Sequence, residues 1–279
     1  MDAGRAAEAR ELAAEARAWL EEWLEEGVEW QPAPPERPAA PATPPDGPAP
    51  DPHPAQPAAA SSAPSSSGDA TAFPRTASPA SERLTLAAWP EARTTLEAVR
   101  ETLGECTRCP LHEGRRTIVF GHGNPDAELM FIGEGPGEQE DRQGLPFVGR
   151  AGELLTRMIE RGLGIPRVEV YICNIVKCRP PGNRNPLPPE VEACRPFLDG
   201  QIQAVRPKVI VTLGKPASSL LLGRDVSITR VRGTWHHYGD VPVMPTFHPA
   251  YILRQYTESN RRLVWQDLQA ALARARGEA

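Results

Sequence analysis

The chain has 279 residues, of which 24% are charged, and a formal net charge of −5. This length is enough for one sizeable domain or two small ones. No apolar run is long enough to span a bilayer, and the N-terminus lacks the apolar core of a signal peptide, so we expect a cytoplasmic protein with reduced thiols and no membrane partner.

Charge is distributed unevenly along the chain. Residues 1–82 hold 5 Arg, no Lys and 14 Asp and Glu, a net charge of −9. The remaining residues hold 26 Lys and Arg against 22 Asp and Glu, a net charge of +4. A mildly basic second part is compatible with a polyanionic partner without requiring one.

The first two segments differ in composition from the rest. Residues 1–30 predict an amphipathic helix, because Ala, Glu, Arg and Leu dominate and the large apolar residues fall near one face. Such a helix can dock a protein partner or the main domain, but a solvated, weakly packed helix is the simpler interpretation. Residues 31–82 predict a disordered linker rich in Pro, Ala and Ser, since positions 31–80 contain 15 of the 32 prolines.

Residues 83–279 predict a globular domain in which strands alternate with helices. Short apolar runs and amphipathic runs follow one another as strand 127–133, helix 149–162, strand 168–174, helix 188–205, strand 207–214, helix 215–222, strand 241–247 and helix 260–276. This alternation predicts an α/β fold, a three-layer α/β/α sandwich with a central four-stranded parallel sheet.

Polar residues stand at the ends of the predicted strands. Glu134 follows the first strand, Asn174 ends the second, and His248 follows the fourth. Ligands of open parallel sheets bind beyond the carboxyl ends of the strands, so these side chains should meet. A single histidine is more often structural than catalytic, but a carboxylate, an amide and an imidazole on one edge make a candidate catalytic set.

A glycine-rich stretch, G-E-G-P-G-E-Q-E-D at positions 133–141, follows the first strand. It matches neither the dinucleotide-binding nor the P-loop signature. Gly135 would let the backbone approach a flat ligand, although a tight turn with solvated acids explains the same residues. Phe147, in the next segment, can stack on a base, although burial in the core is the commoner fate of a single Phe.

Four of the five cysteines predict a metal centre. Cys106 and Cys109 form C-T-R-C, a spacing that lets both thiolates face one metal. Cys178 and Cys194 can join them only if the fold returns the chain to the same place. Four thiolates suit either zinc or an iron–sulfur cluster, and their spacing does not choose between the two.

Taken together, these motifs resemble those of the family 4, or iron–sulfur, uracil-DNA glycosylases. The resemblance runs in order through about residues 95–272 and rests on G-E-G-P-G-E-Q-E-D, P-F-V-G-R-A-G, Y-I-C-N-I-V-K-C-R-P-P-G-N-R, V-R-G-x-W and H-P-A-Y-I-L-R. It implies a 4Fe–4S cluster on the four cysteines named above and uracil-containing DNA as the partner. Cys173 departs from the pattern, and we interpret it as a buried free thiol.

The resemblance also implies roles in breaking the bond between deoxyribose and uracil. Glu134 would orient or deprotonate the attacking water. His248, near uracil O2, would stabilise the departing base anion, and the backbone N–H of Gly135 could assist it. The motifs contain no clear lysine nucleophile, so we expect a monofunctional glycosylase that leaves an abasic site.

Base recognition and DNA contact are assigned to a second group of residues. Phe147 would stack on the flipped base, and Asn174 would read its edge. Glu140 is the candidate wall against the 5-methyl group of thymine. Arg179 and Arg254 are candidate phosphate contacts.

Three alternatives stay open at this point. The domain can be a non-catalytic iron–sulfur DNA-binding module of a polymerase or repair assembly, or a zinc-bound enzyme of the same fold. It can also be a glycosylase for another deaminated base, such as hypoxanthine or xanthine. We expect a monomer in each case.

Overall fold

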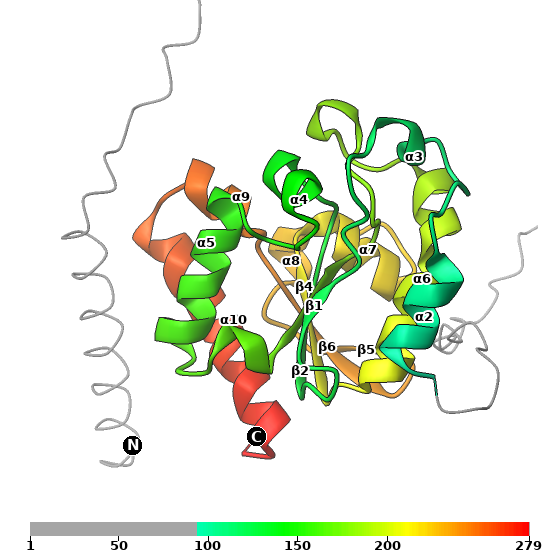
Figure 1. Ribbon diagram of the computed structural model, residues 1–279. Helices are drawn as coiled ribbons and strands as arrows, with labels where there is room; N and C mark the ends of the chain where they lie inside the picture. Colours follow the sequence, from blue (N-terminus) through cyan, green and yellow to red (C-terminus); the bar gives the residue numbers. More distant parts are fainter. Residues whose placement is uncertain (1–93, 279) are drawn as a thin grey trace, which may run out of the picture. The chain divides into compact units, whose positions relative to one another are not determined.

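The computed structural model describes residues 94–278 (Figure 1). The predicted helix at 1–30, the predicted linker at 31–82 and the first residues of the predicted domain therefore lie outside the described part. Within residues 94–278, no helix has the length and apolar character needed to cross a membrane.

A mixed sheet with the strand order β1-β3-β2-β4-β6-β5 forms the centre of the fold. Its four inner strands run parallel: β3 (Tyr171–Asn174), β2 (Leu129–Gly133), β4 (Val209–Leu213) and β6 (Val241–Thr246). Two short strands pair antiparallel at the edges: β1 (His122–Gly123) and β5 (His236–Tyr238). The predicted four-stranded parallel sheet is thus confirmed, with two edge strands in addition.

Helices cover both faces of this sheet (Figure 1). On one face, α6 (Pro188–Val205) and α7 (Lys215–Leu222) contribute Leu198, Ile202, Ala217 and Leu221 to the core that buries Met130 and Ile132 of β2. On the other face, α10 (Glu258–Arg276) contacts β2, β4 and β6. The three-layer α/β/α arrangement is the predicted one.

The remaining helices are shorter and frame the layers. α2 (Leu96–Leu103) packs on α6, and α5 (Arg150–Arg157) continues into a single π-helical turn, Met158–Gly162. The others are α3 (Leu111–Gly114), α4 (Glu138–Gln143), α8 (Ile228–Val231) and α9 (Pro249–Arg254), with 3₁₀ turns at Arg167–Glu169 and Pro181–Asn183.

The sequence explains most of these boundaries. Every residue of β2 and β4 is buried, as expected for central parallel strands covered on both faces. α6 begins with two prolines, which lack the N–H groups that a first turn leaves unpaired. The predicted strand 168–174 starts later than expected, at Tyr171. Residues 167–169 form a 3₁₀ turn in which the side chain of Val168 is 62% exposed.

Candidate active site

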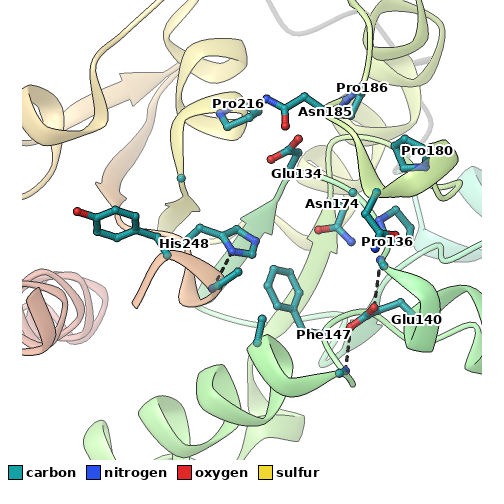
Figure 2. Close-up of a pocket in the computed structure, with 18 of the residues that line it drawn as sticks. Glu134, Pro136, Glu140, Phe147, Asn174, Pro180, Asn185, Pro186, Pro216 and His248 are labelled. Atoms are coloured by element: carbon teal, nitrogen blue, oxygen red, sulfur yellow. Dashed lines mark hydrogen bonds between the residues drawn. The ribbon is translucent and has the colours of Figure 1, made fainter. Parts of the chain in front are cut away.

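A pocket of about 840 Å³ opens at the carboxyl ends of the parallel strands. Figure 2 shows side chains from several separate segments directed into it. Its lining includes seven of the predicted site residues: Glu134, Gly135, Glu140, Phe147, Asn174, His248 and Arg254. The rule that ligands bind beyond the strand ends therefore points to the edge of the sheet at which this pocket opens.

Glu134 directs a half-buried carboxyl group into the pocket from the end of β2 (Figure 2). Burial raises the pKa of this group above its usual range, because removal from water disfavours the charged form. A carboxylate with a raised pKa is a better proton acceptor than an ordinary surface carboxylate. The position and the pKa both suit a general base.

Asn174 ends β3 and is only 2% exposed. Its Oδ1 is a buried acceptor with no hydrogen-bond partner among residues 94–278. An unpaired buried polar atom costs about 1–3 kcal/mol, so it is expected where a ligand supplies the missing partner. The side chain lines the pocket, so this acceptor marks a place for a donor on a bound molecule.

The main chain of Asn174 is held from behind by Lys177, which is 1% exposed. Lys177 Nζ donates to the Asn174 carbonyl at 2.6 Å and to Gln201 Oε1 at 2.5 Å. Gln201 Nε2 in turn donates to the Phe120 carbonyl at 2.8 Å and to the Tyr171 hydroxyl at 3.0 Å. This buried network fixes the end of β3.

His248 precedes α9 and accepts a hydrogen bond at Nδ1 from the Ala250 N–H, at 3.0 Å. In the neutral ring the proton is therefore assigned to Nε2. Burial and, to a smaller extent, the nearby Arg254 charge lower the His248 pKa to about 4, while Glu140 opposes the shift. At neutral pH the site therefore contains an uncharged imidazole whose Nε2–H is a hydrogen-bond donor.

Phe147 places its ring between these polar groups. The ring centroid lies 5.6 Å from that of His248. A Cβ added to Gly133 would lie 2.4 Å from Phe147 Cζ and 2.5 Å from Asn174 Oδ1. Glycine at the end of β2 is therefore required for the ring and the amide to approach each other.

Glu140 fastens the glycine-rich loop to the segment that carries Phe147. Its Oε2 accepts from the Gly137 N–H at 3.0 Å, and its Oε1 accepts from the N–H groups of Val148 and Gly149 at 3.0 and 2.9 Å. These contacts make Glu140 a loop anchor within the pocket lining. Its expected action against the methyl group of thymine stays a prediction.

The two predicted phosphate contacts occupy different positions. Arg254 is exposed at the end of α9 and belongs to the pocket lining. Arg179 lies outside that lining, where its Nε donates to Asn183 Oδ1 at 2.7 Å and its guanidinium is 3.7 Å from Glu138. Arg184 also lines the pocket, and we did not predict it. Its partner Glu190 lies at the start of α6, and the local sequence G-N-R-N-P gave no signal of this pairing.

The four predicted ligand cysteines line one small cavity, although Cys109 and Cys194 are 85 positions apart in the sequence. All four are free thiols, and Arg115 Nη1 donates to Cys178 Sγ at 3.5 Å. Burial raises the pKa of the Cys194 thiol to about 11. Among residues 94–278, no three His, Cys, Asp or Glu side chains converge on a single ion; the thiols surround a cavity instead. Cys173, on β3, is a buried free thiol as predicted.

Comparisons with known proteins agree with this arrangement. The family model described as "Uracil DNA glycosylase superfamily" matches residues 120–269. The chain is 52% identical over 180 residues to a type-4 uracil-DNA glycosylase of Thermotoga maritima, covering 63% of this chain and 92% of the relative. Type-4 uracil-DNA glycosylases of Sulfurisphaera tokodaii and Saccharolobus solfataricus are each 45% identical over 182 residues, covering 62% of this chain and 82% and 83% of the relatives.

Proposed function

Because this chain belongs to the type-4 uracil-DNA glycosylases, within the uracil-DNA glycosylase superfamily, we infer that it removes uracil from DNA. It hydrolyses the bond between the base and deoxyribose, the step that starts base excision repair. The observation that carries this function is the unpaired Oδ1 of Asn174 beside the Phe147 ring in the strand-end pocket.

Recognition of uracil follows from the donor and acceptor pattern of one amide. Asn174 Oδ1 accepts from uracil N3–H, and Nδ2 donates to uracil O4. Cytosine presents the opposite groups at both positions, so the wrong base would leave buried polar atoms unpaired. The Phe147 ring supplies the stacking surface for the base once it has left the duplex.

Bond cleavage requires opposite charges to be stabilised on the two fragments. Glu134 orients or deprotonates the water and offsets the positive charge that develops on the sugar. His248 Nε2–H, on a neutral ring, donates to uracil O2 as the base leaves with negative charge. The backbone N–H of Gly135, in the same lining, is a second candidate donor to this anion.

The enzyme is proposed to be monofunctional. Lys215 lines the pocket, but its Nζ forms an ion pair with Asp225 at 2.9 Å rather than standing free as an amine nucleophile. Water activated by Glu134 is then the nucleophile, and the product is an abasic site in an uncut strand.

Phosphates of the DNA are held by cations at the mouth of the pocket. Arg254 and Arg184 line it, and Arg179 stands on the adjacent loop. Contacts of this kind add affinity without reading sequence, and binding should weaken as salt increases.

The cysteine cavity fits a 4Fe–4S cluster held by Cys106, Cys109, Cys178 and Cys194. A cluster of four irons needs thiolates spread around a cavity, whereas one zinc ion draws its ligands to about 2.3 Å. When bound, the cluster would organise the loops that carry its ligands, since no ligand cysteine lines the strand-end pocket. Iron and sulfide analysis of the purified protein, with its visible absorbance, separates the cluster from zinc.

The Asn174→Asp variant tests the function at the residue that carries it. The new carboxylate lacks the donor for uracil O4 but can accept from the cytosine amino group. We expect uracil release to fall about 100-fold or more, with measurable release of cytosine. The assay counts abasic sites in oligonucleotides that contain uracil, cytosine, thymine, hypoxanthine or xanthine.

Asn124→Asp is the matched control, since its side chain caps a turn at Asp126 N–H and does not line the pocket. A wild-type protein that binds uracil-containing DNA but releases no base would instead support the non-catalytic DNA-binding module. Preferred release of hypoxanthine or xanthine would shift the substrate. Unchanged uracil preference in Asn174→Asp would remove Asn174 as the base reader.

A further inference from the structure

Phe147 has a backbone φ of 53°, in the left-handed region that residues other than glycine seldom adopt. For a bulky aromatic residue this conformation is strained, and it persists only where the surroundings fix it. Strained residues of this kind concentrate at binding sites. The groups that hold Phe147 in this conformation therefore control where its ring stands in the pocket.

Two charged side chains hold the main chain of residues 146–149, one through its N–H groups and the other through its carbonyl groups. Glu140 accepts from the N–H groups that follow Phe147, as described above. Arg167 Nη2 donates to the Pro146 carbonyl at 2.8 Å and to the Phe147 carbonyl at 3.1 Å. The two peptide groups adjoining Phe147 are thus fixed by one anion and one cation.

α5 packs directly against the main chain of Phe147. A Cβ added to Gly152 would lie 1.9 Å from the Phe147 carbonyl carbon and oxygen, so the helix packs directly on that peptide. Arg167 Nη1 donates to Thr156 Oγ1 at 2.7 Å, and Thr156 Oγ1 donates to the Gly152 carbonyl at 2.9 Å. The guanidinium therefore joins α5 to the strained segment.

Arg167 lies outside the lining of the pocket and does not reach the place of the base. We propose that Arg167 is a positioning residue for uracil binding. Its guanidinium holds the carbonyl groups of Pro146 and Phe147 so that the Phe147 ring stays beside Asn174 and His248. The proposal rests on the stacking role of Phe147 in the proposed function. A planar guanidinium can bridge two carbonyl groups and a hydroxyl at once, which a lysine ammonium on a flexible stem does less well.

A double-mutant cycle tests the proposal with the variants Arg167→Met, Phe147→Ala and the two combined. If Arg167 acts through the ring, Arg167→Met should lower kcat/KM on uracil-containing DNA about 10- to 100-fold. It should also weaken inhibition by free uracil, while iron content and visible absorbance stay at wild-type levels. In the Phe147→Ala background the same substitution should cause no further loss.

Two more variants separate positioning from general stability. Arg167→Lys should retain more activity than Arg167→Met, because the ammonium group can still donate to one carbonyl. If the Met variant does not fold, the Lys variant takes its place in the double-mutant cycle. Arg274→Met is the matched control, because it removes a half-buried guanidinium that stacks on Trp235 away from the pocket. Its kcat/KM should equal that of the wild type.

Additive losses in the cycle, or equal losses in Arg167→Met and Arg274→Met, would overturn the positioning role. Full activity of Phe147→Ala would overturn it as well, while the uracil activity of the wild type remained intact. Failure of the proposed function is distinguishable, because it requires a wild-type protein that releases no uracil.

Discussion

The raised pKa of Glu134 links its proposed catalytic role to the stability of the fold. Burial raises the pKa in the folded state above that of the unfolded chain. The unfolded state therefore loses this proton first as pH rises, and the folded state is penalised once pH exceeds the unfolded pKa. Below that value both states are protonated and the penalty vanishes. The negative charge that the proposed role of Glu134 requires is therefore one that the fold disfavours.

We expect Glu134→Gln to lose activity and gain stability at neutral pH. Uracil release should fall about 100-fold or more without its base, while binding of uracil-containing DNA persists. The unfolding midpoint in urea should rise, and this gain should disappear in acid. Glu128→Gln, at a surface carboxylate paired with Lys208, is the control and should change neither quantity appreciably.

The acid limb of the wild-type pH profile should report the same group. Activity should fall as pH decreases through the raised Glu134 pKa, because protonation removes the base. His248 stays neutral until pH approaches its own pKa of about 4. Near-normal turnover of Glu134→Gln would contradict this assignment.

At the scale of an element, the start of α6 connects the pocket rim to the core. Glu190 accepts from the Leu187 N–H at 2.7 Å and forms two contacts with Arg184, which lines the pocket. Arg184 lowers the Glu190 pKa, so this stabilisation is present at neutral pH and is lost as pH falls through the folded pKa.

Glu190→Ala should destabilise the protein by about 1 kcal/mol, the usual cost of a lost helix cap. Arg184 would also lose its partner, so the affinity for DNA should become weaker with little change in kcat. Urea denaturation and salt-dependent DNA binding measure the two effects. The stability difference from the wild type should shrink in acid; a difference that is constant with pH would exclude the ion pair as its source.

How far the sequence predicts these elements depends on whether the signal is local. The bounds of α6 and α7 were predicted residue for residue, because a proline-marked start and an apolar periodicity are read within one segment. β1 and β5, of two and three residues, are too short to show any period.

The residues of the candidate site also fall into those that a local sequence signal predicts and those that it does not. Glu134, Asn174 and His248 were found because each stands at a strand end, and strand ends of a parallel sheet share one edge. Arg167 and Lys177 were missed, because they bind main-chain carbonyl groups that no residue pattern reveals. Val168 misled the strand prediction, since its apolar side chain continues the alternation but is exposed.

At the scale of the whole molecule, the cysteine cavity joins segments that the sheet does not hold together. Cys106 and Cys109 precede α3, Cys178 follows β3, and Cys194 belongs to α6. A bound cluster would connect all three regions near β3, the strand that ends in Asn174. Its removal should therefore disturb the DNA-binding face rather than delete a catalytic group.

Removing the cluster with an oxidant and a chelator should bleach the visible absorbance and expose these segments to proteolysis. We expect cleavage near residues 104–118 and 178–187, with loss of DNA binding alongside loss of uracil release. The Glu134→Gln protein, treated in the same way, isolates the binding effect from catalysis. A cluster-free protein that resists protease and binds DNA normally would contradict the structural role.

The buried position of Lys177 gives the protein an internal chemical reporter. The sequence contains three lysines, and the side chains of Lys208 and Lys215 are 56% and 53% exposed. An amine-reactive label should therefore mark those two in the native state and reach Lys177, at 1% exposure, only when the chain opens. The labelling rate of this one amine, read by mass spectrometry, then measures how often the strand that ends in Asn174 comes loose.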